Sequence, residues 1–134
     1  MKTKKTMNAM VNFLTILTIT DALSRVDEKT LQKYQKSVEG FNTDDELAYK
    51  ELKLEAKAIR GDWEPDWENL SQKKWFPVFY WSPGVGFVFS GSIYRYDRTH
   101  TGSGSRLCFP SEEQANHFGK QFIETHRRYL TIFK

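Results

Sequence analysis

A capping box and a helical repeat of apolar residues predict the clearest helix in the chain. Thr43 lies three residues before a glutamate, an arrangement in which each side chain can cap a backbone amide of the first turn. Apolar residues then recur on one face as far as Gly61, which is suited to a C-terminal cap. The pattern predicts a helix over Asp44–Arg60, with Glu51 and Glu55 on its solvent-exposed side.

A second capping box predicts the last helix. Pro110 ends the preceding segment, and Ser111 lies three residues before a glutamine. Apolar residues recur at helical spacing beyond it, so a single helix is expected over residues 112–129. His126 falls on the apolar stripe of this helix, where a partly buried histidine with a hydrogen-bond partner is the common outcome.

The N-terminal third predicts shorter elements. Residues 13–20 alternate imperfectly between apolar residues and threonine, which fits either a short strand or the first turns of a helix. Thr20 is expected to be the N-cap of a short helix that continues to Val26. Another helix is predicted over residues 28–38, with Gly40 ending it.

After Gly61 the spacing changes from helical to strand-like. Residues 75–81 are rich in aromatic and β-branched types, and a Pro-Gly turn leads into a returning strand over residues 87–96. Gly91, in the middle of that strand, indicates a bulge. Residues 106–109 are predicted to form a short third strand.

The order of these elements predicts an α+β fold with N-terminal helices, a three-stranded antiparallel meander and a C-terminal helix. The length of 134 residues suits a single domain. Its first half, residues 1–61, is mainly helical, and residues 62–134 hold the meander and the last helix. Sixteen of the 20 aromatic residues lie at or after Gly61, so the aromatic content belongs to the second half.

Charge and cysteine content narrow the functional classes only a little. The formal net charge of +3 neither requires nor excludes a nucleic-acid partner. A single cysteine excludes a disulfide framework within the chain and suits a reducing compartment. Lys2, Lys4 and Lys5 precede an apolar-leaning stretch, as in a secretory signal, but polar residues interrupt it and no good cleavage site follows. We therefore expect a cytoplasmic protein without a membrane-spanning segment.

Several short motifs of the second half occur together in one protein family. They are Asp-Trp-Glu-Asn at 66–69, Trp-Phe-Pro at 75–77, Gly-Phe at 86–87, Ser-Arg-Leu-Cys-Phe at 105–109, Gly-Lys-Gln-Phe at 119–122 and Tyr-Leu-Thr-Ile at 129–132. In this combination the chain resembles a family of small proteins of gut bacteria and of their phages and other mobile elements. The resemblance covers about residues 62–132. It implies an intracellular, phage-associated protein and carries over no catalytic residue.

Patterns for catalysis and metal binding are weak. Carboxylates occupy every second position from Asp62 to Glu68, but a calcium loop needs an internal glycine and a closing bidentate glutamate, which are missing. The three histidines lack the spacing of a zinc site. Cys108, between Leu107 and Phe109, is expected to be a small core residue and not a nucleophile. We expect no metal, no cofactor and no enzymatic activity.

The predicted sheet has large apolar side chains on both faces. Along the first strand, Trp75, Phe79 and Trp81 are expected on one face and the residues between them on the other. One face is enough to cover helices, so the other must be covered by further parts of the chain, by a partner or by a ligand.

The candidate binding surface combines the aromatic residues with nearby arginines. It consists of Trp75, Trp81, Tyr94, Tyr96, Arg95, Arg98 and Arg106. Protein interfaces favour aromatic residues and arginine, so a non-catalytic protein-binding adaptor or regulator is the first interpretation. Aromatic stacking beside basic residues also suits single-stranded nucleic acid, which is the alternative partner.

Overall fold

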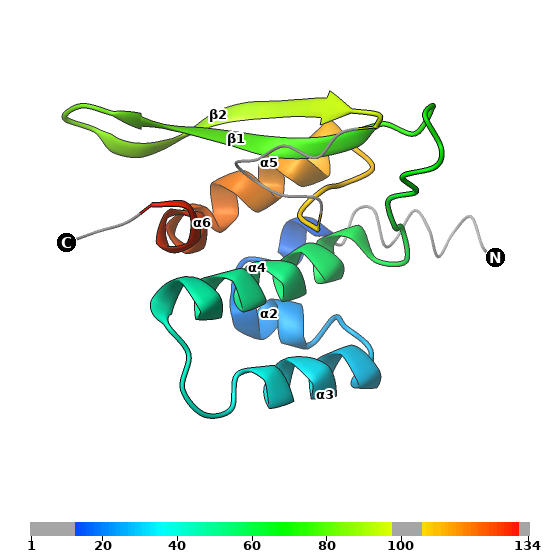
Figure 1. The fold of residues 1–134 in the computed structure, drawn as a ribbon, viewed down its shortest axis with the longest axis vertical. Coiled ribbons are helices and arrows are strands. Elements are labelled where there is room, and N and C mark those ends of the chain that lie inside the picture. The colour runs from blue at the N-terminus through cyan, green and yellow to red at the C-terminus, as the bar shows by residue number, and fades with distance from the viewer. Residues whose placement is uncertain (1–12, 98–105, 132–134) are drawn as a thin grey trace.

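The computed structural model describes residues 13–97 and 106–131, which form helices and a two-stranded antiparallel ribbon. In chain order the elements are η1 (Phe13–Thr15), α2 (Ile19–Leu23), α3 (Glu28–Ser37), α4 (Asp44–Arg60), β1 (Lys74–Ser82), β2 (Gly86–Arg95), α5 (Glu112–Gln121) and α6 (Ile123–Leu130). The ribbon lies on α5 and α6, α4 lies beneath these two helices, and α2 and α3 lie farthest from the ribbon (Figure 1).

The α+β class is confirmed, but the third strand is wrong. Of residues 106–109 only Phe109 pairs with the ribbon, through two backbone hydrogen bonds of 2.9 Å with Trp75. The carbonyl groups of Arg106 and Cys108 instead accept from the Arg60 guanidinium, at 2.7 and 3.4 Å. Pro110, which has no N–H group, follows at once. The segment therefore contributes one bridge and no strand.

The bulge predicted at Gly91 is confirmed. Pro77 pairs with Ser92 and Phe79 pairs with Phe89, so two residues of β2 lie opposite Val78. Gly91 has a φ of 97°, which side chains other than hydrogen rarely allow. The extra residue changes the register within the ribbon.

The predicted N-cap is confirmed for α4 and is wrong for α2. The Thr43 hydroxyl accepts from the backbone of the third residue of α4, at 3.4 Å, and Gly61 ends the helix with a φ of 63°. At α2 the cap is Thr18 and not Thr20. Asp21, three residues after Thr18, completes a reciprocal capping box, with both hydrogen bonds at 3.1 Å.

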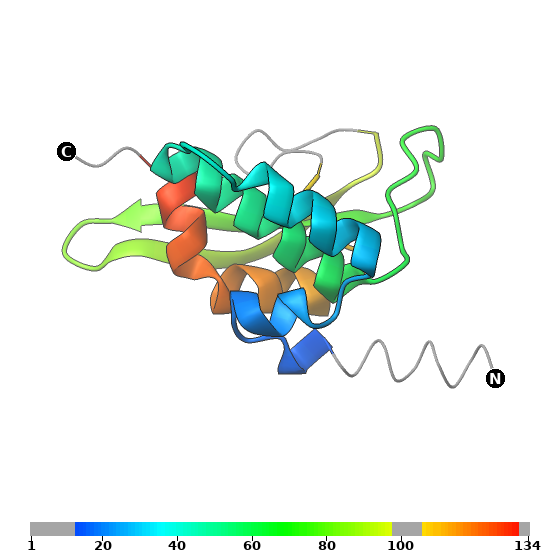
Figure 2. The same cartoon turned by 90° about the horizontal axis from the view of Figure 1, so that it is seen from below.

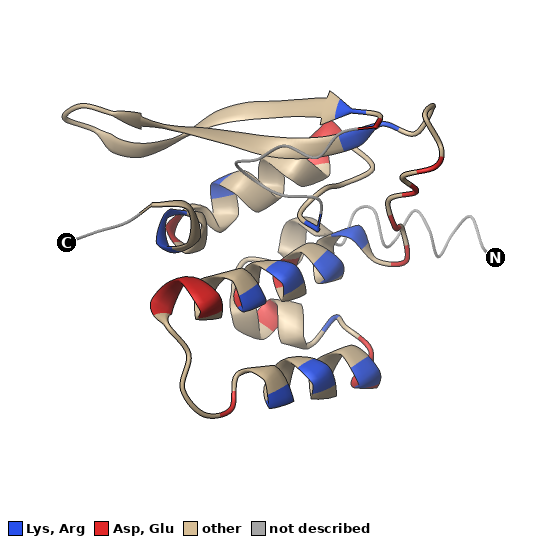
Figure 3. Cartoon of the chain, in the orientation of Figure 1, with Lys and Arg blue, Asp and Glu red and all other residues tan. Residues whose placement is uncertain are grey.

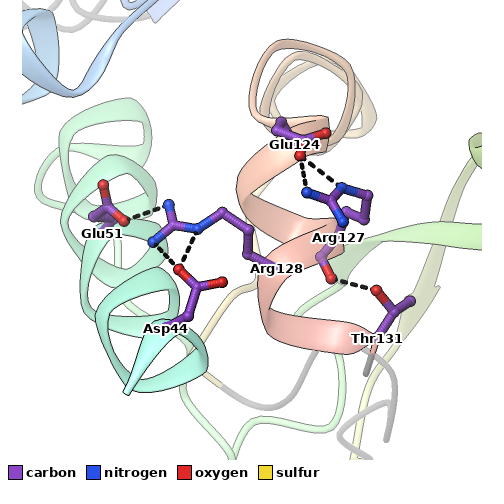
Figure 4. A network of polar contacts seen from close by, with 6 residues as sticks. All are labelled: Asp44, Glu51, Glu124, Arg127, Arg128 and Thr131. Atoms are coloured by element: carbon purple, nitrogen blue, oxygen red, sulfur yellow. Dashed lines mark hydrogen bonds and ion pairs between the residues drawn. The ribbon is translucent and has the colours of Figure 1, made fainter. Parts of the chain in front are cut away.

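The predicted C-terminal helix is two helices, because the chain breaks its helical course at Phe122. The backbone there has φ −109° and ψ 34°, and the Phe122 side chain is buried. The break gives α5 and α6 different directions, and both pack beneath the ribbon (Figures 1 and 2). Arg128 then ties α6 to α4 through contacts of 2.9 Å with Asp44 and Glu51 (Figure 4).

Glu55 is buried, which contradicts its predicted exposure. It lies three to four residues from Leu52 and Ile59, and all three side chains face the interior. Only 2 % of Glu55 is exposed, and its Oε1 has no hydrogen-bond partner among the described residues. The core around it draws on both halves of the chain, including Phe13, Ile16, Leu54, Leu107, Phe109 and Phe118.

Gly119 brings α5 close to the ribbon, and we predict that it does not tolerate a side chain. A Cβ atom at Gly119 would lie 2.6 Å from the Phe89 ring and 2.8 Å from the Pro77 side chain. Alanine favours a helix over glycine by about 1 kcal/mol, but the overpacking outweighs this gain. Gly119→Ala is expected to lower the free energy of unfolding by about 2 kcal/mol in urea titrations.

The double variant Gly119→Ala/Phe89→Leu provides the control, because it removes the ring that meets the new methyl group. It should regain part of the loss relative to the sum of the two single variants. A Gly119→Ala protein that is more stable than the wild type would contradict the close approach.

Candidate functional site

The described helices leave one face of the ribbon uncovered. Both α5 and α6 lie on the same side of it (Figures 1 and 2). On the other face Phe76 and Lys74 are fully buried, and Lys74 Nζ lies 5.0 Å from the centre of the Trp67 ring. Further along the same face, Tyr80 is 51 % exposed. This outer face is therefore closed near the start of β1 and open near the hairpin turn.

Lys74 closes that end through a buried ammonium group. Its Nζ donates to the carbonyl of Tyr96 at 2.8 Å, of Gln72 at 3.2 Å and of Asn69 at 3.4 Å. These bonds fix the segment before β1 against the residue that follows β2. Nothing in the sequence marks this lysine as buried, because a lysine at a strand end is usually solvated.

The ribbon carries no ionisable acid or base apart from tyrosine over the twenty residues from Trp75 to Tyr94. Figure 3 shows charged residues at the end where β1 begins and β2 ends, and none along the ribbon from there to the hairpin turn. At the hairpin turn, Trp81 is 55 % and Val85 is 78 % exposed. The binding residues predicted from the sequence do not include Tyr80 or Val85, although the absence of charge over these twenty residues could have marked the hairpin turn.

A hollow of ≈ 730 Å³ lies at the other end of the ribbon, beside the start of α5. It is lined by Trp75, residues 92–97 and Glu112. The Tyr94 ring lies 4.9 Å from the Trp75 ring and 5.6 Å from the Tyr96 ring, measured between centroids. Lys73 Nζ lies over the Tyr94 ring at 4.7 Å.

The predicted binding residues therefore do not form one continuous site. Trp75, Tyr94, Arg95 and Tyr96 all line the hollow. Trp81 pairs with Phe87 near the opposite end of the ribbon.

Arg106 is not among the residues that line the hollow. Arg106 lies on the α4 side, where its carbonyl accepts a hydrogen bond from Arg60. Burial lowers the pKa of Lys53 on α4, and the charge of Arg106 lowers it further. Arg98 lies outside the described residues.

Reactive groups do not converge in the described parts of the chain. Burial raises the pKa of the Cys108 thiol to about 11, and Cys108 is confirmed as a core residue. Residues 13–97 and 106–131 hold no cluster of three or more metal-ligating side chains. The carboxylates from Asp62 to Glu68 are exposed, and the tryptophans between them are half-buried. His100 falls outside these ranges.

His126 is buried, and only one of its ring nitrogens has a partner. Its Nδ1 donates to the carbonyl of Phe122 at 2.7 Å, and its Nε2 has no partner among the described residues. The ring centroids of Phe79 and Phe118 each lie 4.5 Å from the centroid of the His126 ring. Burial lowers the pKa of His126 to about 4, so the imidazole is neutral at neutral pH. The second histidine of α5–α6, His117, contacts the Ile16 carbonyl instead.

Comparisons with protein-family models, with curated proteins and with solved structures find no match for this chain. The resemblance to small proteins of gut bacteria and their phages therefore stays a prediction. Within the described residues, no helix has the length and apolar character needed to cross a bilayer.

Proposed function

We propose that this chain is a non-catalytic adaptor or regulator that binds another protein through the uncharged hairpin end of its ribbon. We further propose that it acts in the cytoplasm in association with a phage or mobile element. The observation that carries the proposal is the exposure of Tyr80, Trp81 and Val85 on a hairpin without charged residues. Exposed aromatic residues with few charges around them are typical of the centre of a protein interface.

A protein suits this surface better than a nucleic acid. Binding to phosphates depends on lysine and arginine side chains along the path of the strand. No such residue occurs from Trp75 to Tyr94. Lys73, Lys74 and Arg95 lie at one end of the ribbon, and Lys120 Nζ lies 5.7 Å from the centre of the Phe89 ring, on the face that α5 covers. Lys74 is fully buried and already engaged with backbone carbonyls.

Site-specific photo-crosslinking in cells tests the proposal. A photoreactive phenylalanine analogue placed at Tyr80 is expected to give a discrete protein adduct, and the additional substitution Trp81→Ser should abolish it. The matched control is the same analogue at Phe41, which is 89 % exposed but lies between α3 and α4, away from the ribbon. That position should give no discrete adduct.

Two results would contradict protein binding at this surface. Identical adducts from both positions would show random collision, and the absence of any adduct at Tyr80 would leave the surface without a protein partner. Anisotropy of a labelled oligothymidine provides the comparison with the alternative partner. Binding at low salt that weakens steeply as salt is added would favour single-stranded nucleic acid.

A further inference from the structure

The outer edge of β2 has no strand beside it within the described residues. The sheet contains β1 and β2 alone, and Phe109 pairs with the opposite edge, at Trp75. An unpaired edge presents backbone N–H and C=O groups that can bind an extended chain.

The hydrogen bonds of Trp75 show which groups β2 directs outward. Trp75 and Tyr94 are paired residues of the antiparallel ribbon, and both backbone groups of Trp75 are bonded to Phe109, at 2.9 Å each. Trp75 and Tyr94 are therefore a non-hydrogen-bonded pair, in which the backbone groups of the two residues point away from one another. The N–H and C=O of Tyr94 thus face the outer edge of β2.

The same alternation applies two residues earlier. Ser92 pairs with Pro77, so its backbone groups also face the outer edge. Proline has no N–H group, so Pro77 can occupy an outward-facing position on β1 without removing a hydrogen bond between the two strands. The edge consequently offers two consecutive donor–acceptor sets, at Ser92 and Tyr94, and both residues line the hollow beside α5.

The surroundings of Tyr94 indicate what kind of segment would fit. Its ring faces the hollow, next to Trp75. Arg95 also lines the hollow, and its guanidinium donates a hydrogen bond of 2.9 Å to the Tyr94 carbonyl. An N–H group of an added strand would replace the guanidinium as the donor to the Tyr94 carbonyl. The released guanidinium would then favour a carboxylate beside it. An added strand would therefore carry an apolar side chain beside the Trp75 and Tyr94 rings and an acidic one beside Arg95.

We infer that the outer edge of β2 accepts an extended segment of a partner protein as an added strand, held by the backbone of Ser92 and Tyr94, with an apolar side chain in the hollow and an acidic one beside Arg95. Phe109 is the internal precedent, because it makes the same kind of bridge on the opposite edge. This inference rests on the proposed function in one respect, namely that the partner is a protein.

A pair of substitutions at one position tests the use of the backbone. The probe is a displayed library of random peptides, selected on the full chain, from which the strongest binder is synthesised. Tyr94→Val and Tyr94→Pro both remove the aromatic ring, but only Tyr94→Pro removes the outward N–H group. We expect the proline variant to bind this peptide at least about tenfold more weakly than the valine variant, the effect of one to two lost hydrogen bonds.

Peptide methylation provides a second measurement that does not depend on the folding of the proline variant. Methylating the peptide amide that faces Tyr94 should weaken binding to the wild-type protein, whereas methylating the next amide should not. On binding, the Ser92 and Tyr94 amides should also exchange with deuterium more slowly.

Several outcomes would overturn the inference. They are equal binding by the two Tyr94 variants, insensitivity to methylation and the absence of any enriched peptide. Self-association of the chain that Tyr94→Pro abolishes would identify a second copy as the occupant instead. None of these results affects the crosslinking at Tyr80, so failure of this inference and failure of the proposed function are distinguishable.

Discussion

Replacing Glu55 with glutamine is expected to stabilise the protein at neutral and alkaline pH. Burial raises the pKa of this carboxyl from its ordinary value of 4.5 to about 9, and repulsion from Glu51 adds to the increase, whereas Arg128 opposes it. The folded protein therefore holds Glu55 protonated up to about pH 9, whereas the unfolded chain releases the proton above 4.5. Folding at neutral pH must bind that proton.

The direction of the pH dependence follows from this difference. The contribution of Glu55 to stability is fully present below its unfolded pKa and is lost as pH rises through the folded value. Near neutral pH the loss is about 3 kcal/mol, and it grows by roughly 1.4 kcal/mol per pH unit up to the folded pKa. Glutamine avoids the loss but keeps a buried polar group, so the net gain of Glu55→Gln is about 2 kcal/mol near neutral pH.

Urea titrations of wild type and Glu55→Gln across this pH range measure the effect. The matched control is Glu51→Gln, on the same helix, because the Glu51 carboxylate pairs with Arg128 at 2.9 Å. Glu51→Gln should be less stable than the wild type, and the difference in stability between the two proteins should not turn in favour of the variant as the pH rises. If Glu55→Gln were destabilising at every pH, Glu55 would have to be ionised in the folded protein.

Acid is expected to destabilise the protein through His126. The imidazole is fully buried between Phe79 and Phe118, and burial lowers its pKa from 6.5 to about 4. The unfolded chain therefore binds a proton at a higher pH than the folded chain does. The contribution of His126 to the free energy of unfolding is therefore fully present above pH 6.5 and is lost as the pH falls toward 4. The expected loss over this interval is about 3 kcal/mol.

Chemical denaturation of His126→Leu between these two pH values isolates the effect. The leucine side chain has a similar size and does not titrate, so the acid-dependent loss assigned to His126 should disappear in this variant. His117→Gln, in the preceding helix, should retain the loss. An unchanged slope in His126→Leu would mean that other groups dominate the acid sensitivity.

Helix starts and the bulge could be predicted from the sequence because local interactions determine them. The Thr43 cap and the Gly61 terminus depend on residues within one turn of the helix, and both are confirmed. The bulge depends on the positive φ that Gly91 allows, and this too is local. Thr18 and Thr20 are both suited to cap α2. Thr18 is the cap because Asp21, three residues after it, completes the capping box.

Features that depend on distant contacts could not be predicted. The third strand fails because Arg60, about fifty residues away in the sequence, bonds the carbonyl groups of Arg106 and Cys108. Glu55 was placed on the wet side by its charge, although its spacing from Leu52 and Ile59 puts it on the buried stripe. The break at Phe122 separates two helices that pack in different directions, and no proline or glycine marks it.

The candidate site was predicted in part for the same reason. Alternation along a strand predicts the face on which a residue lies, and the sequence therefore placed Trp75, Trp81, Tyr94 and Tyr96 on one surface, whereas only Trp75, Tyr94 and Tyr96 line the hollow. It does not show how far Trp81 lies from them, nor that Arg106 lies beside α4, because both depend on register and packing. The unpaired edge of β2 follows from the two-stranded sheet and from the bridge of Phe109 to the opposite edge, neither of which local sequence determines.

The distribution of lysine determines how this molecule reacts with amine-directed reagents. No lysine occurs between Lys74 and Lys120, whereas Lys29, Lys33 and Lys36 are exposed on α3, the helix farthest from the ribbon (Figure 3). Coupling through amines will therefore attach the protein to a bead or sensor mainly by its helical side and present the hairpin to solution. Trypsin, for its part, will release the whole hairpin as one peptide that ends at Arg95.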